Sequence, residues 1–274
     1  MELGVAIAIV VAATAGAVFA MLLVRRRAPD GGWFTDGDRA AGVFGVLATG
    51  FAVLLGFVVF LAFTSYDAAR AGAEEEALLV AQQVETAQAL PVEVAGDLTA
   101  ELTCYARSVA GVQWDRMEEG TLGEDLNPWS VRMFETVRDV RLETPVQEAA
   151  YGKWLDERSD REQARNDRVH GAVGVIPGPL WVVLFFASAV IGVYLLFFAD
   201  SGEPAVVQAL IMGSVVSVIV SMLLLLQFLD NPFHDGFGGL RPVAMDRTLQ
   251  IIDQELELVS VDVPIPCDAV GNPA

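Results

Sequence analysis

Four arginines at helical spacing are the first residues in this sequence whose pattern suggests chemistry. They are Arg158, Arg161, Arg165 and Arg168. Spacings of three, four and three place them on one face of a helix, which we call the arginine stripe. One interpretation is structural salt bridging, the commoner role of such stripes. The other is an arginine-lined mouth that concentrates small anions.

An acidic segment earlier in the chain is the expected partner of this stripe. The sequence FLAFTSYDAARAGAEEEALLV begins as an apolar run at Phe60 and continues as an acidic helix. If one helix leaves the membrane where a later helix enters it, residue 64+k faces residue 173−k. This register places Asp67 beside Arg168 and His170, and the acids at 74–76 beside the two preceding arginines. The expected juxtamembrane charge network is Asp67, Arg70, Glu75, Arg161, Arg165 and Arg168.

Motifs of enzyme chemistry are missing from the sequence. It contains no GxSxG, no Walker A loop, no HExxH and no paired-cysteine metal motif. Both histidines, His170 and His234, are expected at one membrane surface. They could form a metal-binding or pH-sensing pair, but isolated surface histidines are commoner. We therefore predict a protein that is not an enzyme, with no cofactor and no metal site.

Four apolar runs dominate the sequence. Hydrophobic residues make up 54% of the whole chain. The runs are Leu3–Val24, Val43–Phe63, Leu180–Ala199 and Ala205–Leu229. Each is about 20 residues long, the length that crosses about 30 Å of hydrocarbon at about 1.5 Å per residue. The sequence therefore predicts an all-α protein with four transmembrane helices in a lipid bilayer.

An acidic helical insert separates the two pairs of spans. Residues 64–172 hold 22 of the 36 acidic residues, and this charge opposes binding to nucleic acid. A seam of apolar residues at spacings of three and four predicts a first helix that ends near Pro91. Thr144, Pro145 and Gln147 form the pattern of a capping box at the start of a last helix, which runs toward His170.

The expected organisation has four parts. Residues 1–63 form the first transmembrane pair, and residues 64–172 form a helical extramembrane domain. Residues 173–230 form the second transmembrane pair. Residues 231–274 form a C-terminal helix and a tail that packs on the extramembrane domain.

A row of residues on the second span could line a pore. Its members are Thr49, Val53, Phe57, Phe60 and Thr64, at spacings of four, four, three and four. An apolar constriction of this kind gates a channel by dewetting. The alternatives are aromatic side chains that face lipid and, for the small residues near Thr49, ordinary helix packing. No ionisable residue lies in the middle of a span, which argues against a proton-coupled transporter.

Three further motifs give the sequence a family resemblance. LLGFVVFLAF is followed, after Thr64, by SYDAAR; IPGPLW begins the third span, and LDNPF ends the fourth. From about Val43 to Leu249 the chain resembles the bestrophin-like membrane proteins, a bacterial branch distantly related to bestrophin anion channels. The residues that carry the motifs are Tyr66, Asp67, Asp230, Asn231, Pro232 and Phe233.

The resemblance implies an oligomeric anion channel or channel-like pore, a pentamer that conducts chloride or other small anions. It also implies a hydrophobic neck on the second span, and the LGF match places Phe57 nearest that neck. In bestrophins a run of acids after NPF forms a calcium clasp, but here only Asp235 follows at once, and calcium needs six or more oxygen ligands. The alternative function is a non-conducting membrane scaffold or sensor whose domain binds a partner.

The orientation and the two cysteines are linked. Arg25, Arg26 and Arg27 follow the first span and no base precedes it, so the positive-inside rule places this connector in the cytoplasm. The extramembrane domain and the C-terminus would then lie outside, whereas the resemblance implies a cytosolic domain. Cys104 and Cys267 fall on the same side, and cysteines in an oxidising space tend to pair. We expect a disulfide between them; reduced cytosolic thiols are the alternative.

Overall fold

The computed structural model describes residues 3–121, 127–259 and 264–274. The chain divides into two compact units. The membrane unit comprises the chain up to Ser65 with Gly174–Asp230 and Gly236–Gly238. The extramembrane unit comprises Tyr66–Val173, Asn231–Asp235 and the chain from Gly239 onward. The all-α class is confirmed.

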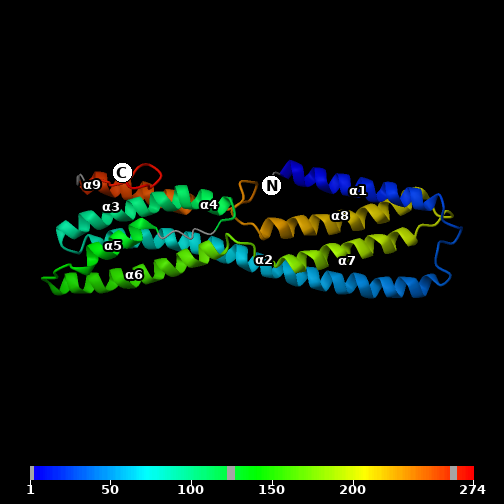
Figure 1. Cartoon of the computed structure of the whole chain (residues 1–274), viewed down its shortest axis with the longest axis horizontal. Coiled ribbons are helices and arrows are strands. Elements are labelled where there is room, and N and C mark those ends of the chain that lie inside the picture. Colours follow the sequence, from blue (N-terminus) through cyan, green and yellow to red (C-terminus); the bar gives the residue numbers. More distant parts are fainter. Residues whose placement is uncertain (1–2, 122–126, 260–263) are drawn as a thin grey trace. The chain divides into compact units, whose positions relative to one another are not determined.

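The membrane unit contains the four predicted spans (Figure 1). They are α1 (Leu3–Arg25), the first part of α2 (Gly37–Ala87), α7 (Gly178–Phe197) and α8 (Ala205–Leu229). All four are long and apolar enough to cross a membrane. α1 lies alongside α8, where Met21 and Met212 are buried together and a Cβ on Gly213 would touch Val18.

An arginine fastens one end of this helix pair. The guanidinium of Arg25, the last residue of α1, donates hydrogen bonds to the carbonyl oxygens of Asp200, Ser201 and Glu203 in the turn between α7 and α8. The carboxylate of Asp200 in turn accepts a hydrogen bond from the amide of Gly31. The connector after α1 is therefore tied to that turn.

The extramembrane unit is a bundle of helices with a continuous apolar core. It holds the rest of α2, α3 (Val92–Ser108), the π-helical turn η1 (Val109–Gln113), α4 (Trp114–Glu118), α5 (Pro128–Arg138), α6 (Pro145–His170) and α9 (Val243–Val259). The core is built around Val80 of α2, Leu102 of α3, Trp129 of α5, Trp154 of α6 and Ile252 of α9. The later part of the predicted seam on α2, from Ala77 to Ala87, faces this core, and its earlier residue Ala69 packs in a second cluster with Trp114.

The start of α6 confirms the predicted capping box. The Thr144 hydroxyl accepts a hydrogen bond from the Gln147 amide, and the Gln147 side chain accepts one from the Thr144 amide. Pro145 occupies the first helical position, where its missing N–H costs nothing. Local sequence thus sets where this 26-residue helix begins.

A disulfide holds the C-terminal tail, residues 264–274, on the bundle. Cys104 of α3 and Cys267 are bridged with a Cα–Cα distance of 5.8 Å, which confirms the predicted pair. Trp129 Nε1 donates a hydrogen bond of 2.7 Å to the Gly271 carbonyl. Gly271 has a φ of +84°, and a Cβ there would collide with the backbone of Ser108. Only glycine suits this position, because it tolerates positive φ and needs no space.

Breaking the bridge is expected to lower the stability of the extramembrane unit. Cys267→Ser removes a cross-link between residues 163 apart. The chain-entropy account assigns so long a loop about 4 kcal/mol. Thermal unfolding of the purified protein, followed by circular dichroism, should give a lower Tm for the variant. A reducing agent should lower the wild-type Tm toward that of Cys267→Ser and leave the variant unchanged; a wild type indifferent to reduction would contradict the expectation.

Candidate functional site

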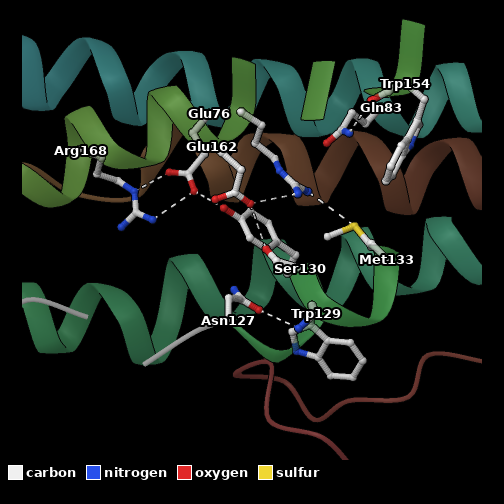
Figure 2. A network of polar contacts seen from close by, with 11 residues as sticks. Glu76, Gln83, Asn127, Trp129, Ser130, Met133, Trp154, Glu162 and Arg168 are labelled. Carbon is white, nitrogen blue, oxygen red and sulfur yellow. Dashed lines mark hydrogen bonds and ion pairs between the residues drawn. The ribbon is translucent and has the colours of Figure 1, made fainter. Parts of the chain in front are cut away.

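A fully buried ion pair joins α2 to α6 in the extramembrane unit (Figure 2). Arg168 Nε lies 2.5 Å from Glu76 Oε2, and Arg168 Nη2 lies 3.1 Å from Glu76 Oε1. The two side chains are 1% and 0% exposed. Tyr105 Oη donates a further hydrogen bond of 2.5 Å to Glu76 Oε1, and Gln113 Oε1 accepts one of 3.2 Å from Arg168 Nη2. The carboxylate and the guanidinium thus compensate each other in a site without solvent.

A glycine allows the two helices to approach this closely. A Cβ on Gly72 would lie 2.7 Å from both the Ala164 carbonyl oxygen and the Arg168 amide nitrogen. Real side chains do not tolerate such contacts, so α2 and α6 pack backbone against backbone at this point. The close approach removes the space in which water would otherwise solvate Arg168.

The predicted contact between Asp67 and Arg168 is wrong. Asp67 is exposed, and Arg168 binds Glu76 instead. Helical side chains lean toward the N-terminus of their own helix. In an antiparallel pair, Arg168 therefore reaches toward later residues of α2, and Glu76 reaches back toward it. Counting Cα positions ignores this lean of both side chains.

The rest of the predicted charge network is divided between the surface and the core. Arg70 pairs with Glu74 on its own helix at 3.0 Å, and both are exposed, as is Glu75. Arg165 is half-buried, and its Nε is enclosed with no hydrogen bond. An exposed pair within one helix contributes little to stability.

Arg161 of the stripe points into the core. It is 0% exposed, and its guanidinium lies 4.3 Å from the centre of the Tyr105 ring. Nη1 contacts Met133 Sδ at 3.5 Å, and Nη2 lies 3.6 Å from Glu162 Oε1. Arg161 and Arg168 are therefore occupied by core contacts, which favours the structural interpretation of the arginine stripe.

Sequence reasoning missed two residues of this site, Tyr105 and Gln113, and the exact partner within the acids at 74–76. Burial and the neighbouring Glu76 carboxylate raise the pKa of Tyr105, so its phenol stays protonated and donates to Glu76. The sequence did contain a sign that Glu76 is buried. Glu76 lies four residues before Val80 and seven after Ala69, and so falls on the apolar face of this helix. An acid within an apolar seam requires a buried partner.

The pore candidates share one uncovered face of α2 in the membrane unit. Val53, Phe57 and Phe60 are 54%, 66% and 62% exposed, and Thr49 and Thr64 are also exposed. The buried residues of this stretch have the same spacing two positions earlier; they are Phe51, Leu55, Val58 and Ala62. Residues two apart lie about 200° around a helix, so the candidates face away from the core of their own unit.

The residues of the LDNPF motif are structural. In the membrane unit, Asp230 at the end of α8 accepts hydrogen bonds from the Ile176 amide at 3.0 Å and from Trp181 Nε1 at 3.4 Å. This carboxylate links the start of α7 to the end of α8. In the extramembrane unit, the buried ring of Phe233 meets Trp114 edge-on at 5.2 Å, so Phe233 anchors the chain after α8.

The other motif residues add smaller contacts. The Pro232 carbonyl accepts a hydrogen bond of 2.8 Å from the Leu240 amide, and Asn231 is exposed while Tyr66 is half-buried. Asp235 pairs with Arg241 at 3.0 Å. Within residues 3–121, 127–259 and 264–274, no group of three or more His, Cys, Asp and Glu is placed to hold a metal ion.

Glu76→Gln is expected to destabilise the extramembrane unit strongly. It leaves the Arg168 charge buried without a counter-charge, a change that costs about 3–5 kcal/mol. Glu75→Gln is the matched control, because the neighbouring acid is exposed and its loss should change the free energy of unfolding by less than about 0.5 kcal/mol. Urea unfolding in detergent, followed by tryptophan fluorescence, measures both. Equal effects of the two substitutions would show that the buried pair contributes nothing special.

Comparison with known proteins places the chain in a family. Residues 9–243 match the bestrophin-like domain. No curated protein matches the chain. Two single-residue variants of a bacterial bestrophin homologue from Klebsiella pneumoniae are structurally similar. One has a TM-score of 0.70 at 14% identity, covering 92% of this chain and 99% of the other. The second has a TM-score of 0.69 at 14% identity, covering 90% and 98%. At this identity the likeness shows the fold, whereas the family match spans most of the sequence: the chain belongs to the bestrophin-like domain family.

Proposed function

We propose that this protein is an oligomeric anion channel whose pore is lined by Thr49, Val53, Phe57, Phe60 and Thr64 of α2. The observation that carries the proposal is the uncovered face of α2 that these residues form, opposite the face that packs within the chain. A closed ring of copies brings one equivalent face of every subunit to the central axis. The family supplies the precedent of a channel.

The residues on this face suit a gated pore. Phe57 and Phe60 are large, apolar and adjacent along the helix axis, as a constriction that excludes water requires. The Thr64 hydroxyl donates a hydrogen bond of 2.8 Å to the Leu61 carbonyl of its own helix, so this polar group already has a partner within the chain. The preference for anions comes from the family alone, because most charges of the extramembrane unit are acidic.

A groove in the extramembrane unit supports assembly into an oligomer. It has a volume of about 790 Å³ and lies between α2 and the segment that begins α9, with Trp114 in its wall. Leu78 and Val243 line it and are 56% and 59% exposed. Apolar side chains left open in this way are typical of surfaces that meet another protein. A neighbouring copy is the occupant that fits a ring.

Phe57→Ala is expected to increase anion flux. Removing the ring widens and wets the constriction, which lowers the barrier to an ion. Liposomes that contain the purified protein and a chloride-sensitive dye report the flux. Phe63→Ala is the matched control, because Phe63 is an exposed aromatic residue of the same helix outside the proposed row. Silence of the wild type, the Phe57 variant and the control would support a non-conducting scaffold or sensor instead.

We also infer that the extramembrane unit and the C-terminus face out of the cytoplasm. Two independent observations support this orientation. The connector after α1 carries Arg25, Arg26 and Arg27, the pattern of a cytoplasmic loop. The Cys104–Cys267 bridge is of a kind that persists in oxidising compartments and is rare in the cytosol of mesophiles. The precedent of the bestrophins favours the opposite side.

The state of the two cysteines in living cells tests this orientation. Cells are acidified to trap thiols, lysed in denaturant and treated with a polyethylene glycol maleimide that adds mass to each free thiol. An outward-facing unit should give protein with no added mass until it is reduced, and then two additions. A variant with a single cysteine at an exposed position, Glu75→Cys in the Cys104→Ser, Cys267→Ser background, should react with an impermeant maleimide on intact spheroplasts. Reaction only after lysis would overturn the inference.

A further inference from the structure

A crevice lies between α1, α7 and α8 of the membrane unit. Its volume is about 460 Å³, and apolar side chains from all three helices form nearly all of its wall. Residues that define it are Ile9 and Ala13 of α1, Phe185 and Gly192 of α7, and Ile219 and Leu223 of α8. None of the pore candidates on α2 lines it. It is therefore separate from the proposed conduction path.

The crevice is continuous with the surface that faces the bilayer. Ile9 and Phe185 line it and are also 39% and 57% exposed on helices that cross the membrane. At this depth the surrounding medium is hydrocarbon and not water. An empty apolar crevice loses dispersion contacts along its whole wall. An acyl chain restores those contacts without bringing in a polar group.

The wall contains few polar groups, and the hydroxyl among them is already satisfied. Ser188 Oγ donates a hydrogen bond of 2.8 Å to the Leu184 carbonyl of its own helix. The crevice thus offers this donor to no ligand, and a polar occupant would lose hydrogen bonds on entering. The chemistry of the wall selects an aliphatic ligand.

One end of the crevice has the features of a membrane interface. Trp181 and Gln227 line it near the start of α7 and the end of α8. Trp181 Nε1 contacts the carboxylate of Asp230 at 3.4 Å, and its ring stacks on Phe185 with centroids 5.7 Å apart. Tryptophan is enriched at the level of lipid head groups. An acyl chain that enters from this end leaves its polar head beside Trp181.

We propose that this crevice is a binding site for one acyl chain of a membrane phospholipid, held between α1, α7 and α8 with its head group near Trp181. The site does not depend on conduction, because its wall and the pore candidates belong to different helices. It gives this protein a specific lipid contact beside its general contact with the bilayer.

Gly192 provides the variant that tests the site. A Cβ at this position meets no atom within 4 Å, and Gly192 lines the crevice, so the side chain of Gly192→Leu occupies the space of the ligand. Gly16→Leu is the matched control. A Cβ on Gly16 of α1 also meets nothing within 4 Å, but Gly16 does not line the crevice. Ala189→Leu, another substitution in the wall, serves if Gly192→Leu does not fold.

The probe is a phosphatidylcholine that carries a diazirine in the middle of one acyl chain, incorporated into nanodiscs with the full-length protein. After illumination, mass spectrometry of the peptides locates the adducts. We expect adducts concentrated on crevice residues of the wild type and of Gly16→Leu, and their loss in Gly192→Leu. All variants must match the wild type in elution volume and Tm.

Three outcomes would overturn the proposal. Crevice residues could be labelled no more than the other exposed faces of α1 and α7. Labelling could persist unchanged in Gly192→Leu and Ala189→Leu. A second copy of the chain could fill the crevice, in which case a photoreactive amino acid at position 189 would form dimers and no lipid adduct. Flux enters none of these measurements, so a protein that fails to conduct leaves the lipid site standing.

Discussion

The extramembrane unit depends on one buried ion pair, Arg168 with Glu76. Burying the Arg168 guanidinium is costly without compensation, which Glu76 provides as the counter-charge and Gln113 as a hydrogen-bond acceptor. Tyr105 in turn donates a hydrogen bond to the Glu76 carboxylate. α2 and α6 are in backbone contact at Gly72, and the side chains of the pair are 1% and 0% exposed. The other core elements are arranged around this constraint: α3 contributes Tyr105, and the π-helical turn η1 contributes Gln113. The charge fixes which face of α2 meets α6, a choice that apolar packing alone would leave less specific.

The membrane unit is packed in a different way, because a charged side chain is costly in hydrocarbon. Two hydroxyl groups of α8 are satisfied within their own helix: Ser214 donates to the Ile211 carbonyl, and Ser217 donates to the Ser214 carbonyl. Helices in lipid therefore associate by shape, as α1 and α8 do at Gly213. α2 combines both kinds of packing. It is one continuous helix from Gly37 to Ala87, with an apolar first part and a buried acid in its second part.

Much of this architecture could be predicted from the sequence because the rules that govern it are local. Span length, the Thr144 capping box and the stop after α2 depend on a few neighbouring residues each. The antiparallel register of α2 and α6 was also predictable, and Gln83 donates to the carbonyl of Trp154 where the count from the two membrane exits places it. The partner of Arg168 was not predictable by that count, because it depends on side-chain direction and on the close packing at Gly72. The pore candidates could be placed on one face by spacing, because spacing alone decides which residues share a side of a helix.

The hydrogen bonds from Arg25 to the turn between α7 and α8 have a consequence for how the protein is made. The acceptor Asp200 lies 175 residues later in the chain. At about 5–20 residues per second, synthesis reaches that turn roughly 9 to 35 seconds after Arg25 has been added to the chain. During this interval α1 exists in the membrane without α8, the helix it packs against. Packing against α8 therefore takes no part in the first insertion of α1, for which its apolar length and the three arginines after it are the local signals. The hydrogen bonds from Arg25 form only after that turn has been made. They therefore stabilise the orientation of α1 but do not select it.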